Sequence, residues 1–150
     1  MSEITTVVLD AMGGDNAPAA MIDGAIDAIS KEKNVKVILV GIEDVIRKGL
    51  EGKTYNPEQI EIVNATEVIE TAEPPVMAIR KKKQSSIVVA MNMVKKGEAD
   101  AFVSAGSSGA ILVGGQLLVG RIKGVERPPL APLLPTEKGV SLLIDCGANV

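Results

Sequence analysis

The sequence has 150 residues, of which 46% are hydrophobic and 23% are charged, with a formal net charge of -3 at pH 7. This length allows one packed domain and argues against a disordered tail. The lack of histidine excludes Ser-His-Asp and Cys-His catalytic groups and the usual zinc sites. One Phe, one Tyr and the acidic balance argue against a nucleic-acid partner. The single cysteine and the lack of a signal-peptide pattern favour the cytoplasm.

Short apolar, β-branched runs alternate along the chain with stretches of helical periodicity. This alternation is typical of βαβ units around a mostly parallel sheet. Nearly continuous apolar runs indicate strands that are buried on both faces. The predicted strands are Ile4 to Leu9, Val35 to Val40, Ile60 to Val63, Ala101 to Ser104 and Val140 to Ile144.

Apolar residues at helical spacing predict amphipathic helices between these strands. The first follows Asn16, the expected N-cap, and has Pro18 in its first turn. A second is predicted over Ser85 to Lys96, with Gly97 as its C-terminal stop. A shorter helix is predicted over Glu43 to Leu50.

The segment Gly109 to Gly120 is the most apolar stretch, but it is well short of the roughly 20 residues that span a bilayer. It predicts a buried helix. Because Gly114, Gly115 and Gly120 each weaken a helix by about 1 kcal/mol relative to alanine, we expect a closely packed neighbour there. The proline-rich segment Arg127 to Pro135 predicts a surface loop, since it suits neither a helix nor a central strand.

Ligands of open parallel sheets bind at the carboxyl ends of the strands. Polar loops follow three predicted strands, at Asp10 to Asp15, Ser104 to Gly109 and Asp145 to Asn149. The last contains Cys146, expected to be a core thiol, and a chain that stops at Val150, just after such a loop, is expected to be one segment of a longer protein.

Glycines and three hydroxyl groups between a strand and a helix make the Ser104 to Gly109 loop a candidate phosphate or carboxylate site. The alternative is an ordinary tight turn, because neither a P-loop nor a dinucleotide-binding signature is present. Asp10 and Asp15 flank a Gly-Gly turn and could hold a metal, orient a substrate or accept hydrogen bonds from their own loop.

A run of four cations, Arg80 to Lys83, leads directly into Ser85 and Ser86. A charge run of this kind is commonly a solvated face. The functional alternatives are a phosphate clamp, with arginine as a bidentate donor, or a landing site for an acidic partner protein.

Five segments together carry a resemblance to a known family. They are Val8 to Pro18, Ala78 to Ser86, Ser104 to Ala110, Val119 to Gly124 and Arg127 to Pro132. In order and spacing they resemble the PlsX family of acyl-carrier-protein:phosphate acyltransferases. The resemblance runs through all 150 residues and corresponds to about the N-terminal half of the family chain.

The resemblance implies a Rossmann-like, three-layer α/β/α fold related to phosphotransacetylase and isocitrate dehydrogenase, and a homodimer. It implies transfer of a long acyl chain from acyl carrier protein to inorganic phosphate, with no cofactor and no metal. The acyl-phosphate then serves a membrane glycerol 3-phosphate acyltransferase. A cytoplasmic enzyme is implied, held at the membrane surface by helices of the other half.

Carried over residue by residue, the resemblance makes Arg80, Lys83 and Ser108 the expected catalytic residues. The expected substrate- and phosphate-binding residues are Asp10, Gly13, Gly14, Asp15, Ser85, Ser86, Ser104, Gly106, Ser107 and Gly109. The chain departs from the family where Ser107 replaces an asparagine, Asn16 a histidine and Cys146 an apolar residue. Two alternatives stay open: a phosphotransacetylase-like enzyme for a small acyl-CoA, and a catalytically silent fragment that binds carrier protein.

Overall fold

The computed structural model describes residues 4–126 and 128–144 of the chain. Up to residue 103 its elements are β1 (Thr5–Asp10), α1 (Ala19–Lys31), β2 (Val35–Gly41), α2 (Glu43–Leu50), the 3-10 turn η1 (Pro57–Gln59), β3 (Ile60–Asn64), α3 (Pro75–Lys81), α4 (Ser86–Lys96) and β4 (Ala101–Val103). The later elements are α5 (Ser108–Gly114), the π-helical turn η2 (Gly115–Val119), β5 (Leu133–Thr136) and β6 (Gly139–Leu142). The first four predicted strands and the helix over 43–50 are confirmed.

A four-stranded parallel sheet forms the centre of the fold, with the strand order β3-β2-β1-β4. Leu9 of β1 lies beside Leu39 of β2 on one side and beside Val103 of β4 on the other. Strand β1 therefore has a neighbour on both edges, and its carboxyl end lies next to that of β4.

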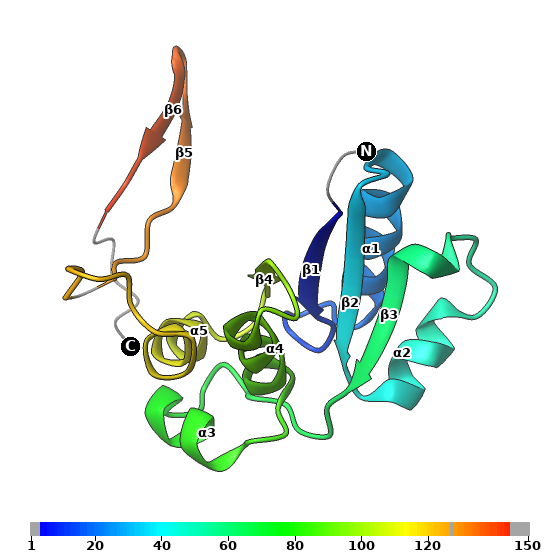
Figure 1. The fold of residues 1–150 in the computed structure, drawn as a ribbon, viewed down its shortest axis with the longest axis horizontal. Coiled ribbons are helices and arrows are strands. Elements are labelled where there is room, and N and C mark those ends of the chain that lie inside the picture. The colour runs from blue at the N-terminus through cyan, green and yellow to red at the C-terminus, as the bar shows by residue number, and fades with distance from the viewer. Residues whose placement is uncertain (1–3, 127, 145–150) are drawn as a thin grey trace.

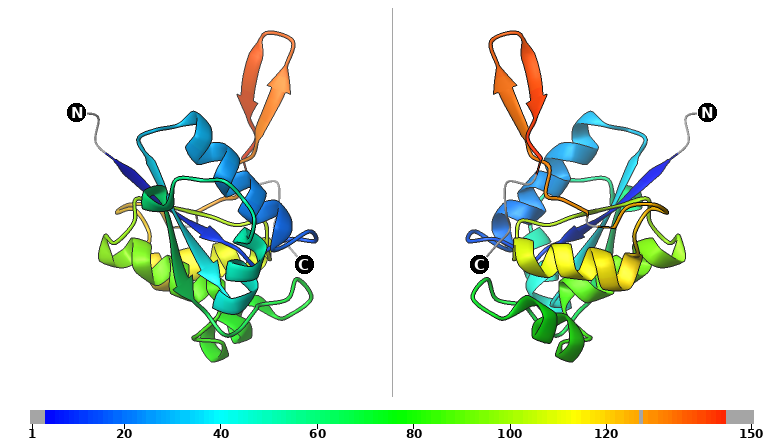
Figure 2. Two further views of the ribbon diagram at one scale, coloured as in Figure 1. Left: turned by 90° about the vertical axis from the view of Figure 1, so that its right-hand side faces the viewer. Right: turned by 90° about the vertical axis from the view of Figure 1, so that its left-hand side faces the viewer.

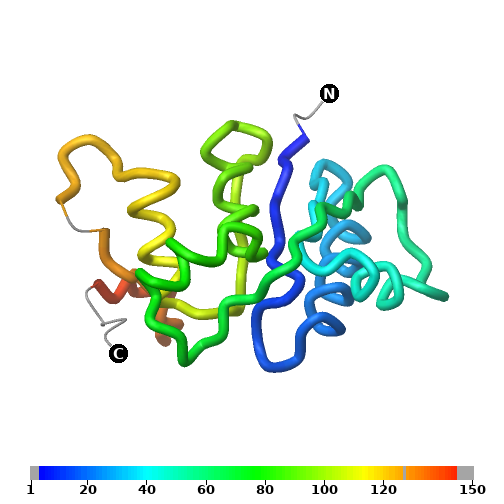
Figure 3. Tube along the Cα trace, turned by 90° about the horizontal axis from the view of Figure 1, so that it is seen from below, coloured from blue at the N-terminus to red at the C-terminus, as the bar shows by residue number. Residues whose placement is uncertain are grey.

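Helices cover both faces of this sheet. Helices α1 and α2 pack on one face and α4 on the other, with α5 and α3 beyond α4 (Figures 1 and 3). Alternate residues of β2 point to opposite faces, as expected for a strand. Val37 and Leu39 pack with α1 and α2, while Ile38 and Val40 pack with Ala90 of α4. The predicted α/β fold with a parallel sheet and three layers is confirmed.

The ends of α1 and α4 show which capping signals are correct. Ser85 caps α4, because its hydroxyl accepts from the Val88 N–H, and Gly97 ends the helix in a left-handed conformation with φ 74°. The prediction that Asn16 caps α1 is wrong. Pro18 occupies that position without a side-chain bond, and Asn16 contributes its backbone carbonyl, which accepts from the Ala20 N–H.

The apolar stretch over 109–120 forms α5 and the π-helical turn, but it is buried on one face only, because Leu117 is 53% exposed. A close neighbour at Gly114 is confirmed, since a Cβ there would meet the Met91 sulfur. The same prediction is wrong for Gly115 and Gly120, which have open space where a Cβ would stand. Within residues 4–126 and 128–144, no helix is both long and apolar enough to cross a membrane.

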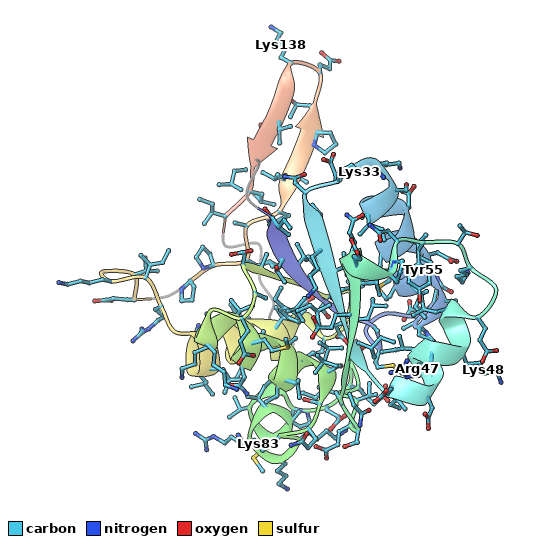
Figure 4. All side chains as sticks on the ribbon, turned by 45° about the vertical axis from the view of Figure 1, so that its right-hand side comes forward. Lys33, Arg47, Lys48, Tyr55, Lys83 and Lys138 are labelled. Carbon is cyan, nitrogen blue, oxygen red and sulfur yellow. The ribbon has the colours of Figure 1, made fainter. Side chains whose placement is uncertain are left out.

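Strands β5 and β6 form a separate antiparallel hairpin that projects away from the sheet (Figures 1 and 2). The predicted fifth strand, Val140 to Ile144, thus overlaps β6, but the prediction that it is buried in the parallel sheet is wrong. Val140 is 66% exposed and pairs with Pro135. A tight turn with Gly139 at φ 136° joins β6 to β5, which includes the end of the predicted proline-rich loop. Lys138 lies at the tip of this hairpin (Figure 4). The predicted loop Asp145–Asn149 with Cys146 lies outside the described residues.

Candidate functional site

The loops that follow β1 and β4 meet at the carboxyl edge of the sheet. Strands β1 and β4 are adjacent and parallel, and their paired residues Leu9 and Val103 immediately precede Asp10 and Ser104. The register of the two strands therefore sets these two polar side chains side by side. This edge is where open parallel sheets bind their ligands.

Asp10 organises both loops through its carboxylate. The side chain is buried, with the residue 1% exposed, and Oδ1 accepts from the Met12 N–H at 3.0 Å. Oδ2 accepts from the Ser104 hydroxyl at 2.8 Å, and the Ser104 Oγ accepts in turn from the Gly106 N–H at 3.0 Å. Among the three roles considered for Asp10, which were metal binding, substrate orientation and hydrogen bonding within its own loop, the structure shows the hydrogen bonding.

Gly13 and Gly14 allow the β1 loop to approach the β4 loop. A Cβ on Gly13 would stand 2.5 Å from Asp10 Oδ2, 2.8 Å from the Gly106 nitrogen and 2.9 Å from Ser104 Oγ. Gly14 has φ 101°, a left-handed conformation that favours glycine, and lies against Ala105. Asp15 is exposed at the end of this turn.

The start of α5 presents backbone donors. Ser107 is buried and caps the helix, since its hydroxyl accepts from the Ala110 N–H at 3.3 Å. In the part of the chain that the structure describes, the N–H groups of Ser107, Ser108 and Gly109 have no protein acceptor. The Ser108 side chain is exposed, and a Cβ on Gly109 would meet Pro75 at 2.7 Å. Three consecutive donors thus open a helix, an arrangement suited to an anion.

The basic run lies at the junction of α3 and α4. Arg80 and Lys81 form the last turn of α3, and the Arg80 side chain has no hydrogen-bond or ion-pair partner among the described residues. Lys83 donates to the Ile79 carbonyl at 3.2 Å and lies on the surface at the foot of the molecule (Figure 4). Sequence reasoning missed α3, although a proline at its first position and cations in its last turn are signals of a helix.

Ser85 and Ser86 are buried below this basic run. The Ser85 hydroxyl donates to the Lys82 carbonyl at 2.8 Å, so it is used in the cap of α4. Backbone bonds join this turn to the segment after β3, where the Ser86 N–H donates to the Glu67 carbonyl. The structure thus brings Asp10, Gly13, Gly14, Ser104 and Gly106 into one cluster, and places Arg80, Lys83, Ser85 and Ser86 in a second group along the α3–α4 junction.

A family model described as "Fatty acid synthesis protein" matches residues 5–150. The chain belongs to this family. One curated relative is the phosphate acyltransferase of Clostridium beijerinckii, which is 51% identical to this chain over 144 residues. The match covers 96% of this chain and 43% of the relative. That of Clostridioides difficile is 50% identical, covering 95% of this chain and 42% of the relative. The chain therefore spans less than half the length of these relatives.

Two solved structures share the fold of this family member. A phosphotransacetylase from Streptococcus pyogenes superposes with a TM-score of 0.65 at 15% identity, covering 98% of this chain and 48% of its own. The EutD phosphotransacetylase from Staphylococcus aureus superposes with a TM-score of 0.60 at 19% identity. That match covers 97% of this chain and 47% of the S. aureus chain. Both likenesses extend over almost the whole of this chain and support the three-layer architecture.

The protein has a groove of about 750 Å³ beside the β4 loop. Ser104 and Ser108 lie on its wall together with apolar side chains such as Phe102 and Ile111, and Arg121 also lines it. Sequence reasoning did not assign Arg121 a role, although the residue lies within one of the segments that carry the family resemblance. No group of three or more acidic or cysteine side chains placed to hold a metal occurs within the described ranges.

An ion pair fixes the turn that carries the basic run. Lys82 donates to Glu73 Oε1 at 2.5 Å and to the Val68 carbonyl at 2.7 Å. The hydrogen bond from Lys82, a second from the Glu70 N–H and the lysine charge together lower the pKa of Glu73, against a smaller opposing effect of burial. The carboxylate form thus stabilises the fold above the ordinary glutamate pKa, and this contribution is lost as pH falls through the lowered value.

Glu73→Gln is therefore expected to be less stable than wild type at pH 7, and the difference is expected to shrink as the pH falls below about 4. Urea unfolding at several pH values measures it. In a Lys82→Met background the substitution should have a smaller effect, because its partner is already absent. An equal loss of stability at pH 7 and pH 3 contradicts the assignment.

Proposed function

We propose that this chain is part of an enzyme that transfers an acyl group to inorganic phosphate. The likeness to the clostridial phosphate acyltransferases along nearly the whole chain is the observation that carries the proposal. The proposed acyl donor is the thioester of acyl carrier protein. The proposed product, acyl-phosphate, supplies a membrane acyltransferase that acylates glycerol 3-phosphate.

The proposed reaction needs little base catalysis. A phosphate oxygen attacks the thioester carbonyl carbon, the C–S bond breaks, and the carrier-protein sulfur leaves with the electron pair as a thiolate, which takes up the proton that the phosphate gives up. Because the second pKa of a phosphate group is about 6 to 7, the nucleophile is largely ionised at neutral pH. A chain with no histidine is suited to such a step. The protein must instead hold the anion beside the carbonyl and stabilise the oxyanion that develops.

The loop between β4 and α5 supplies suitable donors for this task. We assign phosphate or oxyanion binding to the unpartnered N–H groups of residues 107–109, together with the exposed hydroxyl of Ser108. Arg80 and Lys83 supply positive charge. Helix α3 begins against Gly109, and Arg80 lies five residues after Pro75, about 7.5 Å further along the helix axis.

The exposed cations at the α3–α4 junction also favour an acidic partner, and we propose that carrier protein docks there. A homodimer in the cytoplasm, peripherally bound to the inner face of the membrane through the remainder of the longer family chain, completes the proposal. Asp15 and the Gly13–Gly14 turn form the rim of the phosphate site.

Arg80→Ala is expected to raise the KM for phosphate about tenfold, and Ser108→Ala to lower kcat by a similar factor. The assay follows release of carrier-protein thiol by the full-length protein at varied phosphate concentration. Lys48→Ala, an exposed cation of α2 on the other side of the sheet, is the matched control and should leave both constants unchanged. Unchanged constants in both test variants remove Arg80 and Ser108 from the site.

The donor substrate is tested in the same assay. Acyl carrier protein loaded with a long acyl chain is compared with acetyl-CoA, and the acyl-phosphate product is quantified. Turnover of the carrier-protein thioester alone supports the proposal. Turnover of acetyl-CoA alone indicates a phosphotransacetylase-like enzyme, and binding of carrier protein without turnover of either donor indicates a binding module.

A further inference from the structure

The polar cluster between β1 and β4 is already saturated by its own members. The Ser104 hydroxyl gives its proton to Asp10 and accepts the Gly106 N–H, so both ends of the hydroxyl are engaged. The Asp10 carboxylate is buried and holds donors on both oxygens. A carboxylate at this position would also repel a phosphate. These groups are therefore poor candidates for ligands of the anion.

The same bonds determine where the next residues of the loop lie. The Gly106 N–H is fixed on Ser104, and only one residue further the chain enters the cap of α5. Gly13 packs against the opposite side, because the Gly106 Cβ position would be 3.4 Å from the Gly13 Cα. The loop is thus clamped from β1 immediately before the unpartnered N–H groups of residues 107–109.

We propose that Asp10 and Ser104 are positioning residues, which act through Gly106 to hold the N–H groups of residues 107–109 on the phosphate. The inference rests on the proposed function, since it takes these N–H groups as the phosphate donors. Donors fixed before the reaction stabilise developing charge without a cost of reorganisation. Loss of the clamp should therefore weaken phosphate binding even though neither side chain touches the ligand.

Two substitutions break the clamp at different bonds. Ser104→Ala removes the link between Asp10 and Gly106 and leaves the strands intact. Asp10→Asn keeps the shape of the side chain but has one acceptor oxygen, so it cannot accept from both the Met12 N–H and the Ser104 hydroxyl, and one of these two bonds is lost or reversed. Ser104→Ala carries the test alone if Asp10→Asn fails to fold.

The chain offers a matched control at the opposite end of the same strand pair. Asp100 Oδ2 accepts from the Thr6 N–H at 2.7 Å, so this bond also joins residues 94 positions apart next to β1 and β4. Asp100→Asn weakens that link just before β4. Asp100 lines the same groove as Ser104, but its carboxylate bonds to β1 rather than to the β4 loop. A purely structural role of Asp10 and Ser104 would make all three variants behave alike.

In the full-length protein, Ser104→Ala and Asp10→Asn are expected to raise the KM for phosphate at least tenfold, with the KM for the acyl donor within twofold of wild type. The double variant should be little worse than the worse single one, because both break one chain of bonds. Asp100→Asn should keep the wild-type KM for phosphate. Equal phosphate KM values in all variants overturn the inference and leave the proposed function intact.

A binding measurement separates this inference from the proposed reaction. Inorganic phosphate is titrated into ¹⁵N-labelled protein, and the amide signals of residues 107–109 are followed. Saturable shifts in wild type and Asp100→Asn, weakened at least tenfold in the other two variants, support the positioning role even if no acyl transfer occurs. Absence of shifts in wild type, or equal affinity in all four proteins, overturns it.

Discussion

Replacing Leu39 with alanine is expected to lower the free energy of unfolding by about 2–5 kcal/mol. Leu39 is fully buried on β2, the strand between β1 and β3, and packs in the cluster that contains Ile22 and Ile46. The substitution removes apolar contacts and leaves a cavity that rigid strands on both sides cannot close. Because a domain of this size has a stability of about 5–15 kcal/mol, the loss is a large share of the total.

Guanidinium unfolding of the two proteins at equal temperature measures this loss. Leu117→Ala removes the same atoms from a side chain that is half exposed on the π-helical turn. It should cost less than about 1 kcal/mol. If both variants lose the same stability, the core does not lie between α1, α2 and the sheet.

Gly13→Ala is expected to cost about 1–3 kcal/mol of stability and to reduce phosphate-dependent acyl transfer at least tenfold. The new methyl group would meet the Gly106 nitrogen, Ser104 Oγ and Asp10 Oδ2 at distances that require the β1 and β4 loops to separate. These neighbours are a backbone atom and two side chains held by hydrogen bonds, so they cannot turn aside as a flexible side chain could.

Gly24→Ala is the control for this prediction, and it should act in the opposite direction. Gly24 lies within α1, and apart from its chain neighbours and the helix's own backbone no atom of the described residues is within 4 Å of its Cβ position. Alanine there should stabilise the helix by up to about 1 kcal/mol, without a change in activity. Thermal unfolding and the acyl-transfer assay measure both variants, and a Gly13→Ala protein as active as Gly24→Ala contradicts the packing at the site.

The parallel sheet could be predicted because its strands are short apolar runs separated by helical periodicity. The composition of an apolar run does not tell which strand it will pair with. Val140–Ile144 has the composition of a buried strand, yet the turn at residues 137–138 pairs it with the adjacent segment. Helix α3 was missed because its seven residues, the first of which is Pro75, show no full apolar period. Local composition thus predicted element types better than element neighbours.

The sequence was sufficient to predict which loops form the site, but not the hydrogen bonds within it. Polar residues after strands placed Asp10 and Ser104 at one edge of the sheet, and that placement is correct. Their mutual hydrogen bond depends on β1 and β4 being adjacent, which no local pattern states. The use of Ser107 and Ser85 as helix caps likewise depends on where α5 and α4 begin. Hydroxyl groups in a sequence do not reveal whether they face a ligand or their own backbone.

The strand order has a consequence for how the chain folds. Strands β1 and β2 are consecutive in the chain and are separated only by α1 and its loops. The bond between Ser104 and Asp10, in contrast, joins residues 94 positions apart. Contacts between distant positions form slowly, because the chain must lose much of its freedom before they are made. A folding intermediate with β1, β2 and β3 already paired would hold the core cluster between α1, α2 and the sheet, but it would lack the bond between Asp10 and Ser104. The candidate site thus comes into existence with the docking of β4.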